Sequence, residues 1–304
     1  MQNTPVIQLI DQAENIAIKG SLCQKEGQLE EAVFYYKQAL NENPNLQQVH
    51  YNLGIVLYQQ GDLLEAYQSY KKAIALQPDD VNGYYNLGLV LQNQGLFAEA
   101  IDSYQQVINL SKIENSNHHD SVVNSYNNWG CILLQENQTD AAISVFKKAL
   151  LLKPDDFTIY NNIGQALLQK SQLDQGISYL EKSLKLEPLF TTAIHHLGKA
   201  YQTQGLHQEA VEYFQQIIKL EPENLTAYSE SFYSLMEQGK FSEAMTNLQK
   251  VIQNNSFVEG YCKWGSLLAE STDELDKAKL SCAKFLTALK KSNFLNSSSV
   301  REIS

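Results

Sequence analysis

The 304-residue chain has a formal net charge of −11 at pH 7, and its only arginine is Arg301. An acidic surface of this kind repels phosphate groups, so we expect neither nucleic acid nor an anionic membrane as a partner. No run of 18 apolar residues exists, and the N-terminal stretch MQNTPVIQLIDQAENIAIKG is too polar for a signal peptide, which predicts a cytoplasmic protein.

Small, aromatic and proline residues recur along the chain with a period of 34 residues. Gly54 returns as Gly88, and Tyr70 returns as Tyr104. Such a period is typical of a stacked array of short units rather than of two ordinary domains. Numbering each unit from 1 to 34 places the starts of the units at Ala13, Gln47, Val81, Val123, Phe157, Thr191, Leu225 and Glu259.

Each unit is predicted to contain two helices. Position 15 is glycine in five units and Asn137 or Ser171 in two others, and glycine readily takes the left-handed conformation that ends a helix. Proline at position 32, as in Pro78, ends the second helix. Small residues at positions 8 and 20 allow the two helices to approach closely, and a large side chain at position 24 points toward the first helix. Phe232 replaces the glycine at position 8 of the seventh unit, so we expect altered packing there.

The combination of Leu-Gly at positions 7 and 8, alanine at position 20, an aromatic residue at position 24 and proline at position 32 resembles the tetratricopeptide repeat. This resemblance covers residues 13–290. It implies an all-α fold, a right-handed superhelical α-solenoid of about eight tandem helix-turn-helix units whose first helices line a concave groove. Residues 1–12 are then an N-terminal lead-in, and residues 291–304 are expected to be a disordered tail.

A polar insertion, residues 115–122, separates the third and fourth units and reads as a loop or an extended helix end. It contains His118, His119 and Asp120, but no further ligands are visible nearby, so we expect no metal site. The four cysteines have no Cys-x-x-Cys spacing and are expected to be reduced structural thiols.

Asparagine occupies position 6 of the first helix in four consecutive units. Positions 5 and 9 differ across the same units, which argues against simple duplication as the cause. An amide both donates and accepts hydrogen bonds, so it can bind a peptide main chain whatever the side chains are. The row is similar to the asparagine ladder in the tetratricopeptide arm of protein O-linked N-acetylglucosamine transferases, and this likeness implies an extended peptide as ligand. The alternative is structural, with each amide bonded to the adjacent helix. The four residues are Asn52, Asn86, Asn128 and Asn162.

Other groove residues are expected to supply selectivity. Tyr51 and Tyr85 lie near one end of the predicted groove, and His195, His196 and Lys199 lie near the other. Packing in the core is the alternative for the tyrosines.

The repeats occupy nearly the whole chain and contain no phosphate-binding loop, nucleophile elbow or His-Glu-x-x-His run. We therefore expect no enzymatic activity and no cofactor, and we predict a scaffold that binds an extended segment of another protein or a peptide. One alternative is a substrate-recognition arm for a separate glycosyl- or methyltransferase, and another is self-association. The repeats lack arginine, so the lysine, asparagine and arginine clamp that some tetratricopeptide co-chaperones use for a C-terminal carboxylate is not expected.

Overall fold

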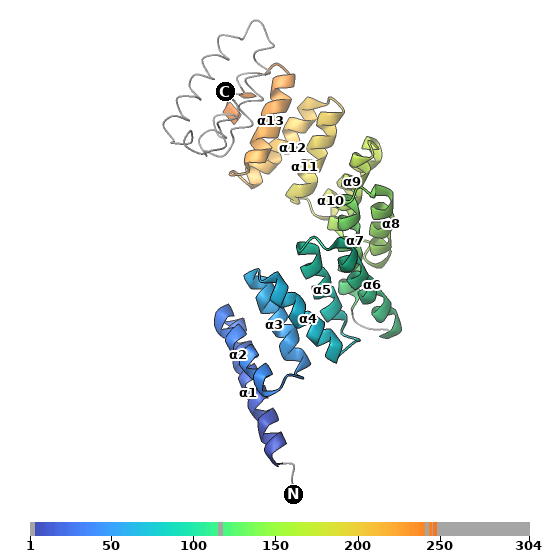
Figure 1. Cartoon of the computed structure of the whole chain (residues 1–304). Coiled ribbons are helices and arrows are strands. Elements are labelled where there is room, and N and C mark those ends of the chain that lie inside the picture. The colour runs from blue at the N-terminus through green and yellow to red at the C-terminus, as the bar shows by residue number, and fades with distance from the viewer. Residues whose placement is uncertain (1–3, 115–117, 241–242, 245, 248–304) are drawn as a thin grey trace, which may run out of the picture. The chain divides into compact units, whose positions relative to one another are not determined.

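The structure, a computed structural model, describes residues 4–114, 118–240, 243–244 and 246–247; residues 4–11 and 113–114 are described by their backbone only. These residues form thirteen α-helices and no β-strand, which confirms the predicted all-α repeat solenoid. In chain order the helices are α1 (Thr4–Lys25), α2 (Leu29–Glu42), α3 (Gln47–Gln60), α4 (Leu63–Leu76), α5 (Val81–Asn93), α6 (Phe97–Glu114), α7 (His119–Gln135), α8 (Thr139–Leu152), α9 (Phe157–Gln169), α10 (Leu173–Leu186), α11 (Thr191–Thr203), α12 (His207–Leu220) and α13 (Leu225–Glu237) (Figure 1).

Neighbouring helices pair as hairpins in the order of the chain. α1 packs against α2, α3 against α4, and the same pairing continues through α9 with α10 and α11 with α12. The chain forms two compact units, Met1–Pro188, which holds α1 to α10, and Leu189–Ser304, which holds α11 to α13. Within the first of these, the second helix of each pair also packs against the first helix of the next pair, so every repeat covers a face of its neighbour.

The first helices begin where the repeat numbering puts the unit starts in five cases: α3, α5, α9, α11 and α13. Asp80 and Asp156 cap α5 and α9, because their carboxylates accept hydrogen bonds from main-chain N–H groups of the first turn. Two helices begin earlier than the numbering suggests: α1 begins at Thr4 rather than at Ala13, and α7 begins at His119 rather than at Val123.

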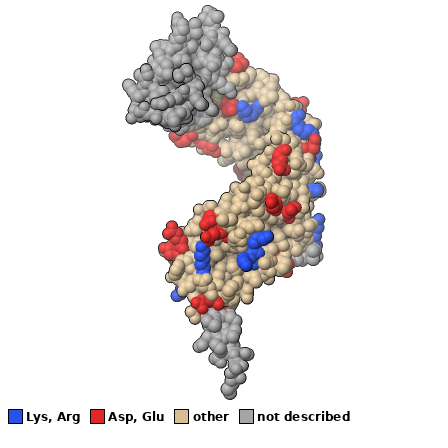
Figure 2. Space-filling view, viewed as in Figure 1, with Lys and Arg blue, Asp and Glu red and all other residues tan. Residues whose placement is uncertain are grey.

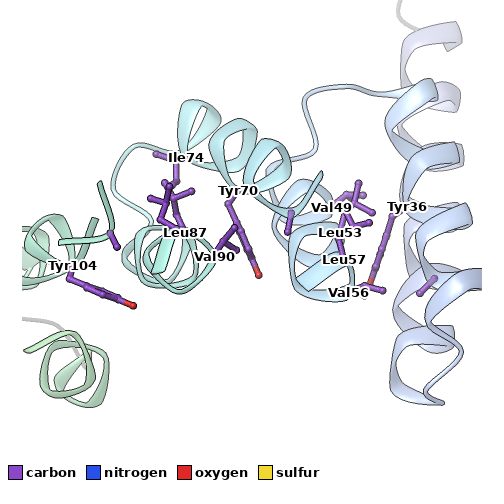
Figure 3. Packing of buried hydrophobic residues seen from close by; sticks show 14 of the residues in the cluster. Tyr36, Val49, Leu53, Val56, Leu57, Tyr70, Ile74, Leu87, Val90 and Tyr104 are labelled. Atoms are coloured by element: carbon purple, nitrogen blue, oxygen red, sulfur yellow. The ribbon is translucent and has the colours of Figure 1, made fainter. Parts of the chain in front are cut away.

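Contacts between positions 8 and 24 form the centre of each hairpin. A Cβ atom added to Gly54 would lie 2.8 Å from the ring of Tyr70, and one added to Gly88 would lie 2.6 Å from the ring of Tyr104. Both tyrosines are buried in a continuous apolar layer that runs from α2 to α6 (Figure 3). The glycines are therefore needed to make room for the rings of position 24, and the alanines of position 20, such as Ala66, are buried beside them.

The turn inside each hairpin contains one left-handed residue, as the sequence predicts. Gly61 has φ +83° and donates its main-chain N–H to the carbonyl oxygens at the end of α3. Asn137 and Ser171 adopt φ values of +60° and +59° at the same position. Both residue types reach this conformation at a steric cost that glycine avoids.

The insertion is largely absorbed by longer helices. Lys112 stands where other repeats have a helix-ending proline, so α6 continues to Glu114 and is 18 residues long. α7 then begins at His119 and is 17 residues long. The Nε2 atom of His119 lies 3.0 Å from the main-chain oxygen of Leu152, which links the lengthened α7 to the end of α8.

Phe232 is accommodated in α13 by small neighbours. Its side chain is buried, and Ser231 and Ser234 beside it are fully buried at the positions that Leu53 and Val56 occupy in the second repeat. The eighth unit, Cys262, Cys282 and the predicted tail lie outside the described residues. Among the helices described, none combines the length and apolar character that a bilayer span requires.

Candidate binding surface on the first helices

The four ladder asparagines lie in the first compact unit. Each belongs to a first helix (α3, α5, α7 or α9), and each side chain is half-buried, neither sealed in the core nor fully exposed. Three of them donate a hydrogen bond through Nδ2 to the preceding repeat. Asn86 donates to the Tyr51 hydroxyl at 2.9 Å, and Asn162 donates to Asn127 Oδ1 at 2.8 Å.

Asn128 makes a longer contact of the same kind, with 3.4 Å between its Nδ2 and the Tyr104 hydroxyl. Asn52 accepts a hydrogen bond at 2.9 Å from Gln48 of its own helix and also interacts with the Tyr36 hydroxyl of the preceding repeat. Position 6 thus joins consecutive repeats throughout the ladder. This is the structural role that the sequence left open as an alternative to ligand binding.

The tyrosines of position 5 belong to the same surface. The ring of Tyr51 meets the ring of Tyr70 edge-on at 5.9 Å, and Tyr85 lies 6.1 Å from Tyr104. A second link between α3 and α5 joins the Nδ2 atom of Asn93 to the Tyr58 hydroxyl at 2.7 Å. Sequence reasoning overlooked this link, although Asn93 and Tyr58 are 35 residues apart, the same separation as Asn86 and Tyr51.

The phenols of this surface, already protonated at physiological pH, become still harder to ionise through burial. Desolvation is the main cause of the raised pKa of Tyr51, Tyr70, Tyr85 and Tyr104, and it outweighs the opposite effect of hydrogen bonds from Asn86 and Asn128 where these occur. Burial likewise raises the pKa of the Cys131 thiol to about 11. The surface therefore presents neutral hydrogen-bond donors and acceptors at physiological pH.

The histidine and lysine residues of the predicted site belong to the second compact unit. His195 lies in α11 with its ring 6.0 Å from that of Phe214, and the Nζ atom of Lys199 lies 3.0 Å from Glu230 Oε2 on α13. Burial is the main cause that lowers the pKa of His195 and lowers the pKa of His196 to about 4, so both rings are neutral at pH 7. The nine predicted residues thus form two groups, one in each compact unit.

The histidines of the insertion do not form a metal cluster with other ligands. The Nε2 atom of His119 contacts a main-chain oxygen, and Asp120 lies 3.9 Å from Lys153. Across the described residues, no group of three or more His, Cys, Asp or Glu side chains could hold a metal ion.

Sequence profiles of tetratricopeptide repeats match the chain over most of its described length. A profile described as TPR repeat matches residues 20–61 and 56–95, and three described as Tetratricopeptide repeat match residues 79–153, 127–189 and 191–224. The chain belongs to the tetratricopeptide repeat family. No match was found among curated proteins.

Solved tetratricopeptide-like structures share the fold. The structure of pilF from Pseudomonas aeruginosa is 19% identical and aligns with 75% of this chain and 99% of its own, with a TM-score of 0.59. A crystal structure of MamA is 26% identical over 56% of this chain and 94% of its own, with a TM-score of 0.51. A chain of the Cut9–Hcn1 hetero-tetramer of APC/C is 16% identical over 77% of this chain and 46% of its own, with a TM-score of 0.56.

The tetratricopeptide surface formed by α3, α5, α7 and α9 is suited to hydrogen bonding rather than to ion pairing. Acidic and basic side chains occur in small separate groups on the face shown in Figure 2. α3 and α5 contain no lysine, arginine or carboxylate, whereas both are rich in amides and phenols. A neutral polar ligand such as a peptide main chain fits this composition.

Proposed function

We propose that this tetratricopeptide protein is a non-catalytic scaffold that binds an extended segment of another protein along α3, α5, α7 and α9. The observation that carries the proposal is the row of half-buried asparagines at position 6, held in register by bonds between consecutive repeats. The segment contacts Asn52, Asn86, Asn128 and Asn162 through its main chain.

The bonds between repeats support this function because they leave hydrogen-bonding capacity on the ladder amides, most clearly on Asn86 and least on Asn162, whose Nδ2 contacts Asn127 and Cys131 and whose Oδ1 accepts from Asn161. A carboxamide offers two N–H hydrogens and one oxygen with two lone pairs, and Asn86 uses one N–H for Tyr51. The remaining groups belong to a side chain that solvent reaches. An amide whose orientation is already restrained loses little conformational entropy when it binds, which favours affinity.

The expected affinity is modest. Four to eight hydrogen bonds at about 1 kcal/mol each yield roughly 4–8 kcal/mol before ordering costs, which corresponds to dissociation constants from about millimolar to micromolar. Neighbouring side chains such as Tyr51 and Tyr85 then supply selectivity for particular sequences.

The test is capture of partners from a lysate of the source cells by immobilised wild-type protein and by a variant in which all four ladder asparagines are alanine. Both proteins must first show equal helicity by circular dichroism at the capture temperature. We expect at least one partner to bind the wild type and to be absent from the variant. Direct titration of that partner should then show a dissociation constant at least tenfold weaker for the variant.

A matched control removes the same number of carboxamides from the second helices. Gln38, Asn41, Gln68 and Gln106 are exposed on α2, α4 and α6, and their joint replacement by alanine should leave capture unchanged. Retention of the partner by both variants would show that the ladder serves only to join repeats, and equal loss from both would show that binding does not depend specifically on the ladder.

The second candidate is a substrate-recognition arm for a separate glycosyl- or methyltransferase. It rests on the likeness of the asparagine row to the sugar-transferase arm. The same capture experiment tests it, because a transferase lost together with the asparagines would favour this candidate over a general scaffold. Self-association is the third candidate, and light scattering that shows only monomer across a range of concentrations would eliminate it.

A further inference from the structure

The hydroxyl group of Tyr70 has no acceptor within the protein. The residue as a whole is 2% exposed, its hydroxyl makes no hydrogen bond to the residues that the structure describes, and the oxygen is not among the polar atoms sealed from solvent. The equivalent tyrosines of the first and third repeats differ. Tyr36 donates to Gln24 Oε1 at 2.6 Å, and Tyr104 donates to Gln92 Oε1 at 2.8 Å.

The cause is a single change of residue at position 12. Gln24 and Gln92 occupy that position in the first and third repeats, but the second repeat has Tyr58 there. A phenol at this place has no carbonyl oxygen to offer to Tyr70. Figure 3 shows the Tyr70 hydroxyl at the edge of the apolar layer, on the same side as the hydroxyl groups of Tyr36 and Tyr104.

Two further phenols, Tyr51 and Tyr58, lie near Tyr70. The ring of Tyr51 lies 5.9 Å from that of Tyr70, and Tyr51 and Tyr58 are both close enough to raise the pKa of Tyr70 further, after burial as the main cause. Tyr51 accepts a hydrogen bond from Asn86, and Tyr58 accepts one from Asn93. Each hydroxyl therefore uses a lone pair within the protein and keeps its own hydrogen for another acceptor.

We infer that Tyr70, Tyr51 and Tyr58 form a donor site for an amide carbonyl oxygen of the bound segment, a conclusion that rests on the proposed function. Three neighbouring O–H donors favour a ligand group that accepts hydrogen bonds. The carbonyl belongs either to the main chain of the segment or to an asparagine or glutamine side chain. Its binding would fix the register of the segment on α3 and α5.

A carboxylate ligand fits the site less well. α3 and α5 contain no lysine or arginine, so a carboxylate would lose hydration without meeting a cation. Asp80, which accepts a hydrogen bond from Gln47, also lies near enough to Tyr51 to raise the pKa of that phenol. The net charge of −11 disfavours an acidic segment further. A neutral carbonyl avoids all three costs.

The site can first be tested without a ligand. Tyr104→Phe breaks the hydrogen bond to Gln92 and leaves that acceptor unpaired, so we expect a lower melting temperature. Tyr70→Phe removes a hydroxyl that makes no bond within the protein, so the melting temperature should be unchanged or higher. A decrease for Tyr70→Phe as large as that for Tyr104→Phe would overturn the inference, because it would reveal an internal acceptor for Tyr70.

The binding test uses peptides from a library of random 12-residue sequences displayed on phage and selected on the full-length wild-type protein. Dissociation constants of a selected peptide are then measured by fluorescence anisotropy. We expect Tyr70→Phe to weaken binding about fivefold to tenfold, as loss of one hydrogen bond predicts. Tyr58→Gln should have a similar effect, because it supplies Tyr70 with the acceptor that Gln24 and Gln92 supply elsewhere. Tyr35→Phe, which removes a hydroxyl from the second helix α2, is the control and should bind like the wild type.

Changes in the peptide distinguish the two sources of the carbonyl. Replacement of one asparagine or glutamine by alanine should abolish the difference between wild type and Tyr70→Phe if a side chain is bound. If the main chain is bound, the difference between wild type and Tyr70→Phe should instead disappear when one peptide amide is replaced by an ester, which weakens the main-chain acceptor. Dependence on an aspartate, a glutamate or the terminal carboxylate would overturn the inference.

The two proposals fail in different ways. A peptide that binds wild type and Tyr70→Phe equally but loses affinity for the asparagine-to-alanine variant would overturn the donor site and leave the proposed function standing. Failure of the selection to yield any peptide that binds the first helices would overturn both.

Discussion

At repeat position 6, consecutive repeats are joined by different chemistry in the two compact units. In the first unit, the ladder asparagine of one repeat donates to a neutral group of the preceding repeat, as Asn162 does to Asn127. In the second unit, Glu230 occupies the same repeat position and pairs with Lys199 of the preceding repeat at 3.0 Å. Position 6 therefore serves as a joint in both units, and only the pairing of side chains differs. Neutral joints resist salt, whereas an exposed ion pair is screened by it.

The largest effect on the free energy of unfolding is expected where a glycine of position 8 packs against the ring of position 24, in either compact unit. A Cβ atom at Gly88 would lie 2.6 Å from the Tyr104 ring, and one at Gly198 would lie 2.6 Å from the Phe214 ring. Gly88→Ala and Gly198→Ala should therefore each lower the free energy of unfolding by about 1–3 kcal/mol in urea titrations. Asn82→Ala, at an exposed position of α5, is the control and should change it little. An equally small effect of either glycine variant would show that the ring can move aside.

The next largest effect is expected for the hydrogen bond between Asn162 and Asn127, compared with an exposed asparagine that makes no such bond. Asn162→Ala removes the donor to Asn127 and leaves a half-buried acceptor unpaired, so we expect a loss of about 1–2 kcal/mol. The loss should be the same in 0.05 M and 1 M sodium chloride. Asn124→Ala, on the exposed side of α7, should be neutral. Strong salt dependence of the Asn162 variant would contradict a neutral joint.

The stability of the second compact unit should depend on pH through His196. The pKa of His196 falls from 6.5 to about 4 because burial disfavours the charged ring. Below pH 6.5 the unfolded chain takes up a proton that the folded chain does not, so stability is lost as the pH falls from about 6.5 to about 4. The loss should be on the order of 1 kcal/mol, since the ring is partly exposed. His196→Gln should reduce the fall in melting temperature between pH 7 and pH 5, and an unchanged fall would assign it to other groups.

The smallest effect is expected at the ion pair. The side chains of Lys199 and Glu230 remain 45% and 24% exposed, so Lys199→Met should cost about 0–1 kcal/mol at low salt. The difference from wild type should vanish in 1 M sodium chloride. Lys219→Met, at an exposed position of α12, provides the comparison. If the two methionine variants behave alike at low salt, the pair does not stabilise the second unit.

Local rules predicted much of the fold. Glycine at position 15, with Asn137 and Ser171 as substitutes, indicated the left-handed turns that the structure contains. The 34-residue period located the first residue of α3, α5, α9, α11 and α13, because each helix start depends on nearby residues alone. The insertion was harder to predict. Loss of proline at Lys112 allowed α6 to continue, and the contact from His119 to Leu152 that stabilises the early start of α7 joins residues 33 positions apart.

By itself, the sequence determined the repeat, its two helices and the row of asparagines, since each depends on residue type and spacing within 34 positions. Only the tertiary structure decided what those asparagines touch, because the bonds of Asn86 and Asn162 cross to a neighbouring repeat 35 residues away. It also decided that Tyr70 lacks an acceptor while Tyr36 and Tyr104 have one. All three tyrosines look alike in the repeat pattern. Whether such a hydroxyl finds an acceptor within the protein depends on which side chain lies opposite in space, and that becomes visible only once the helices are packed.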